Sequence, residues 1–479
     1  MNVNGTEEAE IRTVKDTTER EYRFISKLGE GGQGTIWKTQ FEGFLVKLAN
    51  KKIAENRKGY YSRLKYIMDR VDLPAESFAK PQALLQEPDC GYVMELMTDM
   101  KPLSELMMPP PESENNIIEW YKKDGAIKRR YTLLKKLAKI IMDIHSVGFS
   151  YGDISPYNIF VSSDPEHHEV QLIDCDNLTI ARNINGEILY TPKYAAPELI
   201  SKQGSHNTLT DAWSFAVIAY QLITLKHPLL GDMVNNGEPE LEEKALAGDI
   251  PWIEDETDKN NICSDNIGLR SSLVIFKSVM ELFQQTFGEQ KSVWKRPGMQ
   301  EWYEKLKKID FRFLKCDECE EYFLPRKEMK CRFCETIKTE NYVVILKFVR
   351  WEPEAEEGTR ITRSKELGLP KIMLNRGDYI TIDSILSHIK NFKLEIKYIK
   401  ETDKIQFHLT EGENKSIFIR LKRENFDDID TQKEHETELV KGTKKSIKSW
   451  NPNGKEKEYL IHFGELTEPH RMITFKWQS

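Results

Sequence analysis

Beyond residue 341 the chain consists of short runs in which hydrophobic and polar residues alternate. This alternation has the period of a β-strand with one buried face. Gly and Asn turns separate the runs, which are residues 342–351, 378–382, 392–399, 405–409, 416–421, 459–463 and 472–477. The pattern predicts an all-β sandwich or barrel over residues 341–479.

Before residue 310 the pattern mixes strands with helices. Residues 35–39 and 43–48 have the pattern of two strands in a hairpin. Residues 210–224 are apolar nearly all round, which predicts a helix buried inside a large core. That helix is too short, and too polar at its start, to span a membrane. This part of the chain is therefore expected to form an α+β domain.

A glycine-rich segment precedes the predicted hairpin. Gly29, Gly31 and Gly34 make the pattern G-x-G-x-x-G, and Ile36 follows two residues later. Glycine has no Cβ, so a backbone loop of this kind can approach phosphate groups closely. The same spacing also marks dinucleotide-binding turns, but there the glycines open a helix. Because strands follow here, we favour a lid between two strands.

Side chains that suit phosphoryl transfer lie further along the chain. Asp153 and Asn158 have the spacing D-x-x-x-x-N, and Asp174 follows a short apolar run. Phosphoryl transfer with two Mg²⁺ ions uses an acid that accepts a hydroxyl proton, and an amide and a carboxylate that hold metal. The spacing alone is common by chance, so its value depends on the order of the elements around it.

That order resembles the protein-kinase superfamily over residues 21–310. The resemblance implies a bilobal α+β fold, with an N-lobe over residues 21–97 and a C-lobe over residues 98–310. Residues 1–20 would then be an N-terminal tail.

The same resemblance assigns catalytic roles to four residues. Asp153 would be the base that accepts the hydroxyl proton, and Lys47 would contact the α- and β-phosphates of ATP. Asn158 and Asp174 would hold Mg²⁺. These residues imply the activity of an ATP-dependent kinase.

The nucleotide site is also implied by the resemblance. ATP would bind beneath the glycine-rich segment with Ile36 and Lys47 beside it. Its adenine edge would meet the backbone C=O of Glu95 and the N–H of Met97, which follow Met94 at the gatekeeper position.

Residues 190–198 end in Ala-Pro-Glu and resemble the end of a kinase activation segment. Thr191 lies where Ser/Thr-specific kinases carry a threonine beside the catalytic aspartate. Asp211 is expected to brace the catalytic loop, and Arg296 is expected to pair with Glu198. Small-molecule kinases usually lack these features, so we favour Ser/Thr side chains of proteins as the substrate.

Several residues depart from the usual kinase pattern. Gly152 replaces an arginine that normally receives a phosphorylated activation loop, so we expect constitutive or partner-controlled activity rather than activation by loop phosphorylation. Ser155 replaces the lysine that commonly follows the base by two residues and neutralises the γ-phosphate. Cys175 and Asp176 stand where Phe and Gly are usual. We interpret Cys175 as a small buried hydrophobic residue. Asp176 is either a second metal neighbour or a cap of the next turn, and we favour the cap.

The glutamate that normally pairs with the kinase lysine is hard to find. The helix expected after Lys47 offers acids at its ends, Glu55 and Asp69, which are too close to Lys47 or too far from it. Because that ion pair must be in place for transfer, the alternative is an ATP-binding pseudokinase that acts as a scaffold. Since the base and the metal aspartate are both present, we favour an active kinase.

Four cysteines follow the kinase-like segment as two Cys-x-x-Cys pairs: Cys316, Cys319, Cys331 and Cys334. Four thiolates are the ligand set of structural Zn²⁺, so the spacing predicts a Cys₄ zinc ribbon over residues 311–340. A redox pair or disulfides fit less well, because there are two matched pairs and no βαβ context. An iron–sulfur cluster would need less even spacing. A closed Cys₄ site is expected to organise folding or a partner surface rather than catalysis.

Composition limits the compartment and the partners. The 479 residues have a net charge of −7, which favours neither a nucleic-acid nor a membrane partner. The start of the chain is polar without an apolar stretch, so we expect no signal peptide. Seven cysteines, four of them in matched pairs, suit a reducing cytosol, and we expect a cytoplasmic protein.

The remaining question is what the C-terminal part binds. Gly377-Asp378, Ser387-His388 and Asn453-Gly454 loosely resemble a phosphothreonine-reading forkhead-associated domain, but the simpler interpretation is a β-sandwich that binds a protein partner, with Trp351, Trp450 and Trp477 in its core. A kinase followed by a Cys₄ ribbon resembles a group of bacterial Ser/Thr kinases in stress or defence gene clusters. This implies a regulatory partner for residues 311–479.

Overall fold

In the computed structural model, the chain divides into two compact units. The first comprises Met1–Ser271 and Ile275–Tyr303, and the second comprises Ser272–Val274 and Glu304–Ser479. The described residues are 12–72, 77–180, 190–264, 268–290, 292–309, 312–316, 318–324, 330–337, 343–353, 361–362, 367, 369, 371–375, 377–399, 401–402, 404–412, 417–422, 437–448 and 458–477.

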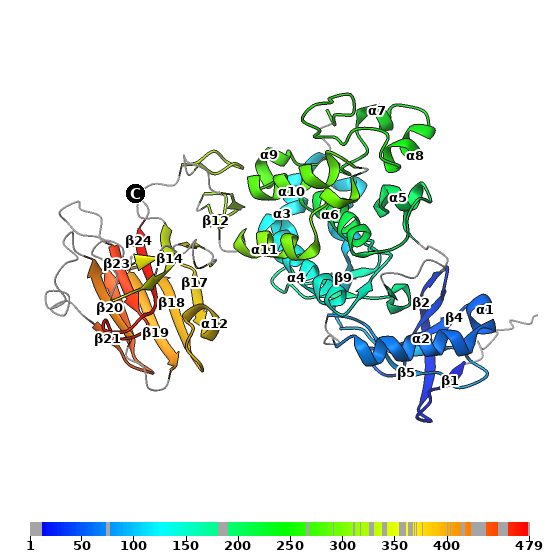
Figure 1. Cartoon of the computed structure of the whole chain (residues 1–479), viewed down its shortest axis with the longest axis horizontal. Coiled ribbons are helices and arrows are strands. Elements are labelled where there is room, and N and C mark those ends of the chain that lie inside the picture. Colours follow the sequence, from blue (N-terminus) through cyan, green and yellow to red (C-terminus); the bar gives the residue numbers. More distant parts are fainter. Residues whose placement is uncertain are drawn as a thin grey trace, which may run out of the picture. The chain divides into compact units, whose positions relative to one another are not determined.

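The first unit begins with an antiparallel sheet (Figure 1). Its strands, in spatial order, are β1 (Thr13–Lys15), β2 (Glu21–Gly31), β3 (Gly34–Thr39), β4 (Phe44–Ala49), β6 (Gly91–Glu95) and β5 (Pro81–Leu84). The expected hairpin is present as β3 and β4. Strand β1 lies inside the expected tail of residues 1–20, yet it pairs with β2, so the sheet begins before residue 21.

Two helices follow strand β4. They are α1 (Lys51–Glu55) and α2 (Arg57–Arg70), and α1 begins at Asn50, whose side chain accepts a hydrogen bond from the N–H of Ile53. Helix α2 buries Tyr60, Leu64 and Ile67, which lie on one face because they are spaced by four and three residues. This face carries Tyr60 into the interior of the unit.

The rest of the first unit is mainly helical and is built around α6 (Thr208–Thr224). A capping box at Asn207 begins the helix, since its side chain accepts hydrogen bonds from the N–H groups of Leu209 and Thr210. The side chains of α6 are buried along nearly its whole length, which confirms the predicted buried helix. Helix α4 (Ala126–Ser146) packs against α6.

Further helices precede or follow α4 and α6 in the chain. They are α3 (Ile117–Lys123), α5 (Pro197–Ile200), α7 (Asp232–Asn235), α8 (Glu240–Leu246), α9 (Ser271–Val274), α10 (Lys277–Phe287) and α11 (Met299–Ile309), with 3₁₀ turns η1 (Leu103–Leu106), η2 (Pro111–Asn116), η3 (Cys175–Asn177), η4 (Pro192–Tyr194) and η5 (Val293–Lys295). Helices α9 and α11 cross the boundary between the two units.

Short strands hold the segments that carry the catalytic motifs. One small sheet has the order β10 (Val170–Leu172), β9 (Ile159–Ser162), β7 (Met100–Pro102), and β8 (Phe149–Ser150) pairs with β11 (Thr179–Ile180). The loop that carries Asp153 and Asn158, predicted to be catalytic, therefore runs between β8 and β9, and the predicted metal-binding loop follows β10. No helix in the described part of the chain is long and apolar enough to cross a membrane.

The second unit contains two antiparallel sheets in its C-terminal part (Figure 1). One has the order β15 (Ile361–Thr362), β14 (Val343–Trp351), β24 (His470–Trp477), β23 (Glu458–His462), β20 (Ile417–Lys422), β21 (Thr437–Leu439), with β16 (Ile372–Asn375) also paired to β14. The other has the order β17 (Tyr379–Asp383), β18 (Lys393–Ile399), β19 (Lys404–Glu411), β22 (Lys444–Lys448).

The two sheets share a hydrophobic core. Leu346 and Phe475 from the first sheet belong to the same buried cluster as Ile396 and Phe407 from the second. This arrangement confirms the predicted sandwich-like all-β architecture. The alternating runs correctly predicted seven strands, which are β14, β17, β18, β19, β20, β23 and β24. They did not predict the short strands β15, β16, β21 and β22.

The structure describes only some of the residues that were predicted for the core and turns of the β-sandwich. Trp351 is buried as expected, whereas the side chains of Trp450 and Trp477 and the pair Asn453-Gly454 lie outside the described residues. Ser387 is buried at the end of helix α12 (Ser384–Ser387), and its hydroxyl donates to the backbone oxygen of Asp383. This serine therefore stabilises the turn at the end of the helix.

Candidate active site and metal centre

The predicted base, Asp153, is held by residues from two separate segments. Asn158 donates from Nδ2 to the backbone oxygen of Asp153 at 3.0 Å and to its Oδ2 at 3.1 Å. Thr191 donates to Asp153 Oδ1 from its backbone N–H at 2.9 Å and from its hydroxyl at 2.8 Å. Thr191 therefore lies beside Asp153, as predicted, and the carboxylate of Asp153 has a fixed orientation.

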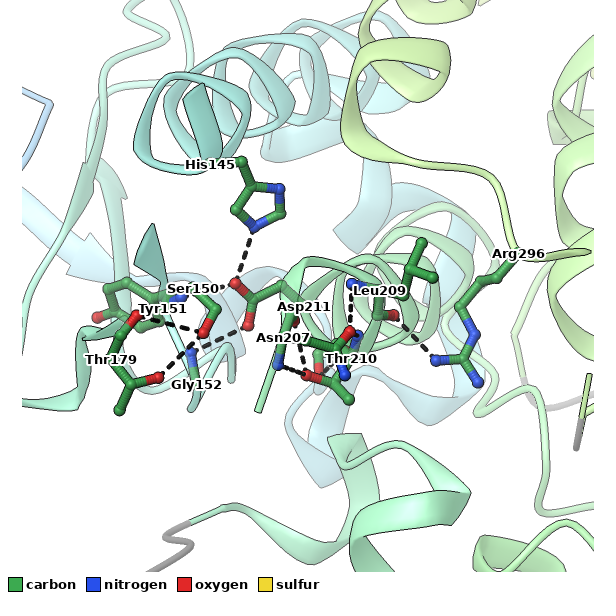
Figure 2. A network of polar contacts seen from close by, with 11 residues as sticks. His145, Ser150, Tyr151, Gly152, Thr179, Asn207, Leu209, Thr210, Asp211 and Arg296 are labelled. Carbon is green, nitrogen blue, oxygen red and sulfur yellow. Dashed lines mark hydrogen bonds and ion pairs between the residues drawn. The ribbon is translucent and has the colours of Figure 1, made fainter. Parts of the chain in front are cut away.

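Asp211 braces the backbone just before the base (Figure 2). Its carboxylate accepts from the N–H of Tyr151 at 2.6 Å and from the N–H of Gly152 at 3.0 Å, and His145 Nε2 lies 2.9 Å from its Oδ2. Asp211 is only 1% exposed, so these three partners replace water around a buried charge. The predicted brace is confirmed.

Glycine at position 152 fits this tight arrangement. Its φ of +90° is unfavourable for residues with a side chain, and an added Cβ would lie 3.0 Å from the backbone oxygen of Asn177. The sequence departure at Gly152 therefore agrees with the local backbone.

The predicted pair of Arg296 and Glu198 is also present. The guanidinium donates from Nη1 and Nη2 to the two carboxylate oxygens at 2.9 and 3.2 Å, and Nη1 also reaches the backbone oxygen of Leu209 at 2.9 Å. Arg296 lies over the ring of Trp213 as well, with its Cζ 4.9 Å from the ring centre. Through its bidentate pair with Glu198 and its bond to Leu209, Arg296 ties the end of the predicted activation segment to the start of α6.

Lys47 lies at the centre of the site and is 2% exposed. Its Nζ is 2.6 Å from Asp174 Oδ1 and 3.1 Å from Asp176 Oδ2. Burial alone would lower the pKa of Lys47, but the carboxylates of Asp176 and Asp174 raise it above its ordinary value. The ammonium group therefore stays charged at neutral pH.

Asp176 differs from its predicted role as a cap. It lies within the 3₁₀ turn η3, and its buried carboxylate accepts from the hydroxyls of Tyr92 at 2.6 Å and Tyr60 at 2.8 Å. Burial raises the pKa of both tyrosines, so both hydroxyls remain protonated donors. Burial would raise the pKa of Asp176 too, but Lys47 and the two hydroxyls hold it below its ordinary value.

The predicted metal ligand Asp174 has an unusual backbone. Its φ of 64° and ψ of 55° are in the left-handed region, which a non-glycine residue rarely adopts. Such backbone strain persists where the surroundings determine it, and it clusters at functional sites. Next to Asp174, the hydroxyl of Tyr151 donates to the backbone oxygen of Ile173 and ties the metal-binding loop to the catalytic loop.

The glycine-rich segment forms the turn between β2 and β3, as predicted. An added Cβ at Gly34 would lie 2.0 Å from the backbone oxygen of Leu48, so only glycine fits against β4 there. At the tip, Gln33 accepts from Lys47 Nζ at 3.3 Å and donates to Asn177 Oδ1 at 2.9 Å. The turn therefore reaches both Lys47 and the metal-binding loop.

The two backbone groups expected to meet adenine have a partner within the chain. Gln171 accepts from the N–H of Met97 at 3.3 Å and donates to the C=O of Glu95 at 3.2 Å. Gln171 is fully buried on β10, opposite Phe160 of β9. An adenine that binds these two groups must share them with Gln171 or displace it. Sequence reasoning missed this residue, because only the fold brings β10 to the segment after β6.

The four predicted zinc ligands are brought together in the second unit. The sulfur atoms of Cys316, Cys319, Cys331 and Cys334 lie within 4.8 Å of one another. The pairs Cys316–Cys334 and Cys319–Cys331 are 3.5 and 3.7 Å apart, and all four cysteines are free of disulfides. Tetrahedral coordination at about 2.3 Å requires sulfur atoms roughly 3.8 Å apart, so the cluster fits Zn²⁺.

A short hairpin carries the first cysteine pair. Strand β12 (Leu314–Lys315) pairs with β13 (Tyr322–Phe323), and Phe323 is buried in one cluster with the cysteines. Asn375 accepts from the N–H of Lys315 at 2.9 Å, so the hairpin is also joined to β16 of the β-sandwich. The cysteine cluster and the sandwich are parts of one compact unit.

The fold brings Lys47 to Asp174 and Asn158 to Asp153, so the side chains that the sequence suggests for phosphoryl transfer lie in two contacting pairs. Residues 22–304 match the protein kinase domain family. Because this match covers more than half of the chain, the chain belongs to the protein kinase family.

Relatives agree with that family at low identity. Myosin light chain kinase A of Dictyostelium discoideum is 27% identical over 50% of this chain and 76% of its own length. Serine/threonine-protein kinase 17A of Oryctolagus cuniculus is 29% identical over 21% of this chain and 25% of its own length. Serine/threonine-protein kinase pkn2 of Myxococcus xanthus is 29% identical over 26% of this chain and 15% of its own length. The chain therefore spans about three quarters of the first relative but a quarter or less of the other two.

Proposed function

We propose that this chain is an active protein kinase that transfers the γ-phosphoryl group of Mg-ATP to Ser or Thr hydroxyls of proteins. The observation that carries the proposal is the arrangement around Asp153, which Asn158 and Thr191 orient from two sides. A pseudokinase would not need an oriented base.

The residues of this chain would divide the reaction among them. Mg-ATP supplies the phosphoryl group when bound, with Asn158 and Asp174 as the metal-holding residues and Lys47 on the phosphates. Asp153 orients the acceptor hydroxyl and takes its proton. The turn that contains Gln33 would cover the phosphates, since it reaches Lys47 and Asn177.

Autophosphorylation with labelled ATP tests this function. Transfer of label is expected with the wild type and is expected to vanish in Asp153→Ala and Asp174→Ala. Asp69→Ala is a matched control, because this acid lies exposed at the end of α2, and its activity is expected to equal that of the wild type. Binding of ATP without transfer to the chain itself or to a general protein acceptor would instead support the scaffold alternative.

For residues 311–479 we propose a regulatory protein partner and a role in bacterial stress or defence signalling in the cytoplasm. The closed Cys₄ cluster and the β-sandwich form one compact unit, which suits a binding module. Co-purification read by mass spectrometry should recover a partner with the wild type and lose it with Cys316→Ser. Asp153→Ala is the control that should keep the partner, and recovery of the same partner with Cys316→Ser would contradict the proposal.

A further inference from the structure

The kinase lysine of this chain has an unexpected set of acidic neighbours. In protein kinases a glutamate on the helix after the lysine fixes it for transfer. Here Glu55 and Asp69, the acids at the two ends of α1 and α2, are exposed. Among the described residues, the carboxylates within ion-pair distance of Lys47 are those of Asp174 and Asp176.

Asp176 has the surroundings of a permanent partner. Both of its oxygens accept hydrogen bonds, Oδ1 from Tyr92 and Oδ2 from Tyr60, while Oδ2 also faces Lys47. Because the residue is only 2% exposed, a metal ion would have to replace one of these protein donors. The carboxylate is therefore built to face an ammonium group and two hydroxyls, which is also why it is not a metal neighbour.

Asp174 cannot be the permanent partner of Lys47 alone. The predicted metal role requires its carboxylate for Mg²⁺, and it is more exposed than Asp176, with 23% of its side chain accessible against 1%. When Asp174 serves a metal ion, Asp176 remains as the anchor of Lys47.

The contact with Tyr60 connects this anchor to α2. Tyr60 lies on the buried face of that helix, where a partner of the kinase lysine would be expected, but it offers a hydroxyl instead of a carboxylate. Helix α2 is thus linked to Lys47 through Asp176 rather than by a direct contact. Four elements meet at this point: β4 with Lys47, α2 with Tyr60, β6 with Tyr92 and η3 with Asp176.

We propose that Asp176 is the positioning residue that fixes Lys47, in place of a glutamate on the helix after it, and that Tyr60 links α2 to that pair. The inference rests on the proposed kinase function, because its main readout is phosphoryl transfer.

Kinetics of Asp176→Asn in the full chain test the proposal. The variant is expected to lower kcat on the order of 10²-fold, because a phosphate-binding group that moves by about 1 Å costs that much. Tyr60→Phe should lower kcat about tenfold, since it removes one hydrogen bond to a charged group. The Mg²⁺ concentration for half-maximal rate should stay unchanged in both variants, whereas a shift of that concentration with Asp176→Asn would identify a metal ligand and overturn the proposal.

A rescue distinguishes positioning from a general loss of structure. Tyr60→Glu combined with Asp176→Asn moves the acid to α2 and should restore kcat to within about tenfold of the wild type. Asp69→Glu combined with Asp176→Asn is the matched control, which should restore nothing. Absence of rescue in a double variant with the wild-type melting temperature would overturn the proposal.

Failure of the proposed function gives a different pattern. If the wild type transfers no phosphoryl group, Mg-ATP affinity by calorimetry still tests the pair, with a loss of about tenfold expected for Asp176→Asn and none for Asp69→Asn. If Asp176→Asn does not fold, the combined Tyr60→Phe and Tyr92→Phe variant decides. A wild-type kcat and affinity in that variant would refute the link.

Discussion

Thr191 places two hydrogen bonds on one oxygen of Asp153, at 2.8 Å from its hydroxyl and 2.9 Å from its backbone N–H. The two residues are 38 positions apart in the chain. Their contact fixes the carboxylate from the side of the activation segment, while Asn158 fixes it from within the catalytic loop. The position of the segment that contains Thr191 is thereby coupled to the orientation of the predicted base.

Thr191→Val is expected to lower kcat about tenfold, because it removes the hydroxyl that orients a charged carboxylate and leaves the size of the side chain unchanged. Thr191→Ser keeps the hydroxyl and should retain activity within about threefold. Steady-state kinetics with a peptide acceptor measure both. Equal kcat values for the wild type and Thr191→Val would show that the hydroxyl does not serve the base.

Asp211→Asn tests the brace shown in Figure 2. The amide has one acceptor oxygen for the N–H groups of Tyr151 and Gly152, which both lie in a buried region. We expect the free energy of unfolding to fall by about 3 kcal/mol, measured by urea denaturation. Asp143→Asn on α4 is the control, since its partly exposed pair with Lys139 should contribute less than about 1 kcal/mol. A loss from Asp211→Asn no larger than that of the control would contradict the brace.

The candidate site shows which contacts can be predicted from the sequence alone. Asp153 and Asn158 lie five residues apart in one loop, so their contact follows from local loop geometry and could be expected from the motif. The role of Asp176 was mispredicted because it depends on Tyr60, which lies 116 residues away and looks like an ordinary buried aromatic residue. The available signal is the pair Tyr60 and Tyr92, together with a helix α2 whose buried face carries no acid.

The C-terminal unit shows the same limit on a larger scale. Its longer strands alternate regularly and were predictable, because one face of each is buried in the core shared by the two sheets. Strands β15 and β21 have only two and three residues, which is too short for a period to be visible. Their pairing depends on neighbouring strands rather than on their own sequence.

His227 predicts a pH dependence of stability. Its Nε2 lies 2.8 Å from the backbone oxygen of Lys193, and its Nδ1 accepts from the N–H of Leu229 at 3.2 Å. Burial lowers the pKa of His227 to about 4, so the unfolded chain binds a proton at higher pH than the folded chain does. Stability is therefore complete above the unfolded pKa of about 6.5 and is lost as the pH falls towards 4.

The size of this loss is limited by one proton. The free energy of unfolding should fall by at most about 1.4 kcal/mol per pH unit between pH 6.5 and 4. His227→Gln should remove this part of the slope, whereas His167→Gln at an exposed position should keep it. Urea denaturation at several pH values measures the slopes, and an unchanged slope in His227→Gln would assign the pH dependence to other groups.

The Cys₄ cluster predicts one bound Zn²⁺ per chain. Metal analysis of the purified protein should find this zinc, and Cys316→Ser or Cys331→Ser should lower its content, because three thiolates close the site less well than four. Cys263→Ser is the control, since this cysteine lies in the other compact unit. Removal of the metal by a chelator should make residues 311–340 sensitive to protease, because a structural zinc site contributes its binding free energy to folding. Iron with visible absorbance in place of zinc would instead identify a cluster of the iron–sulfur type.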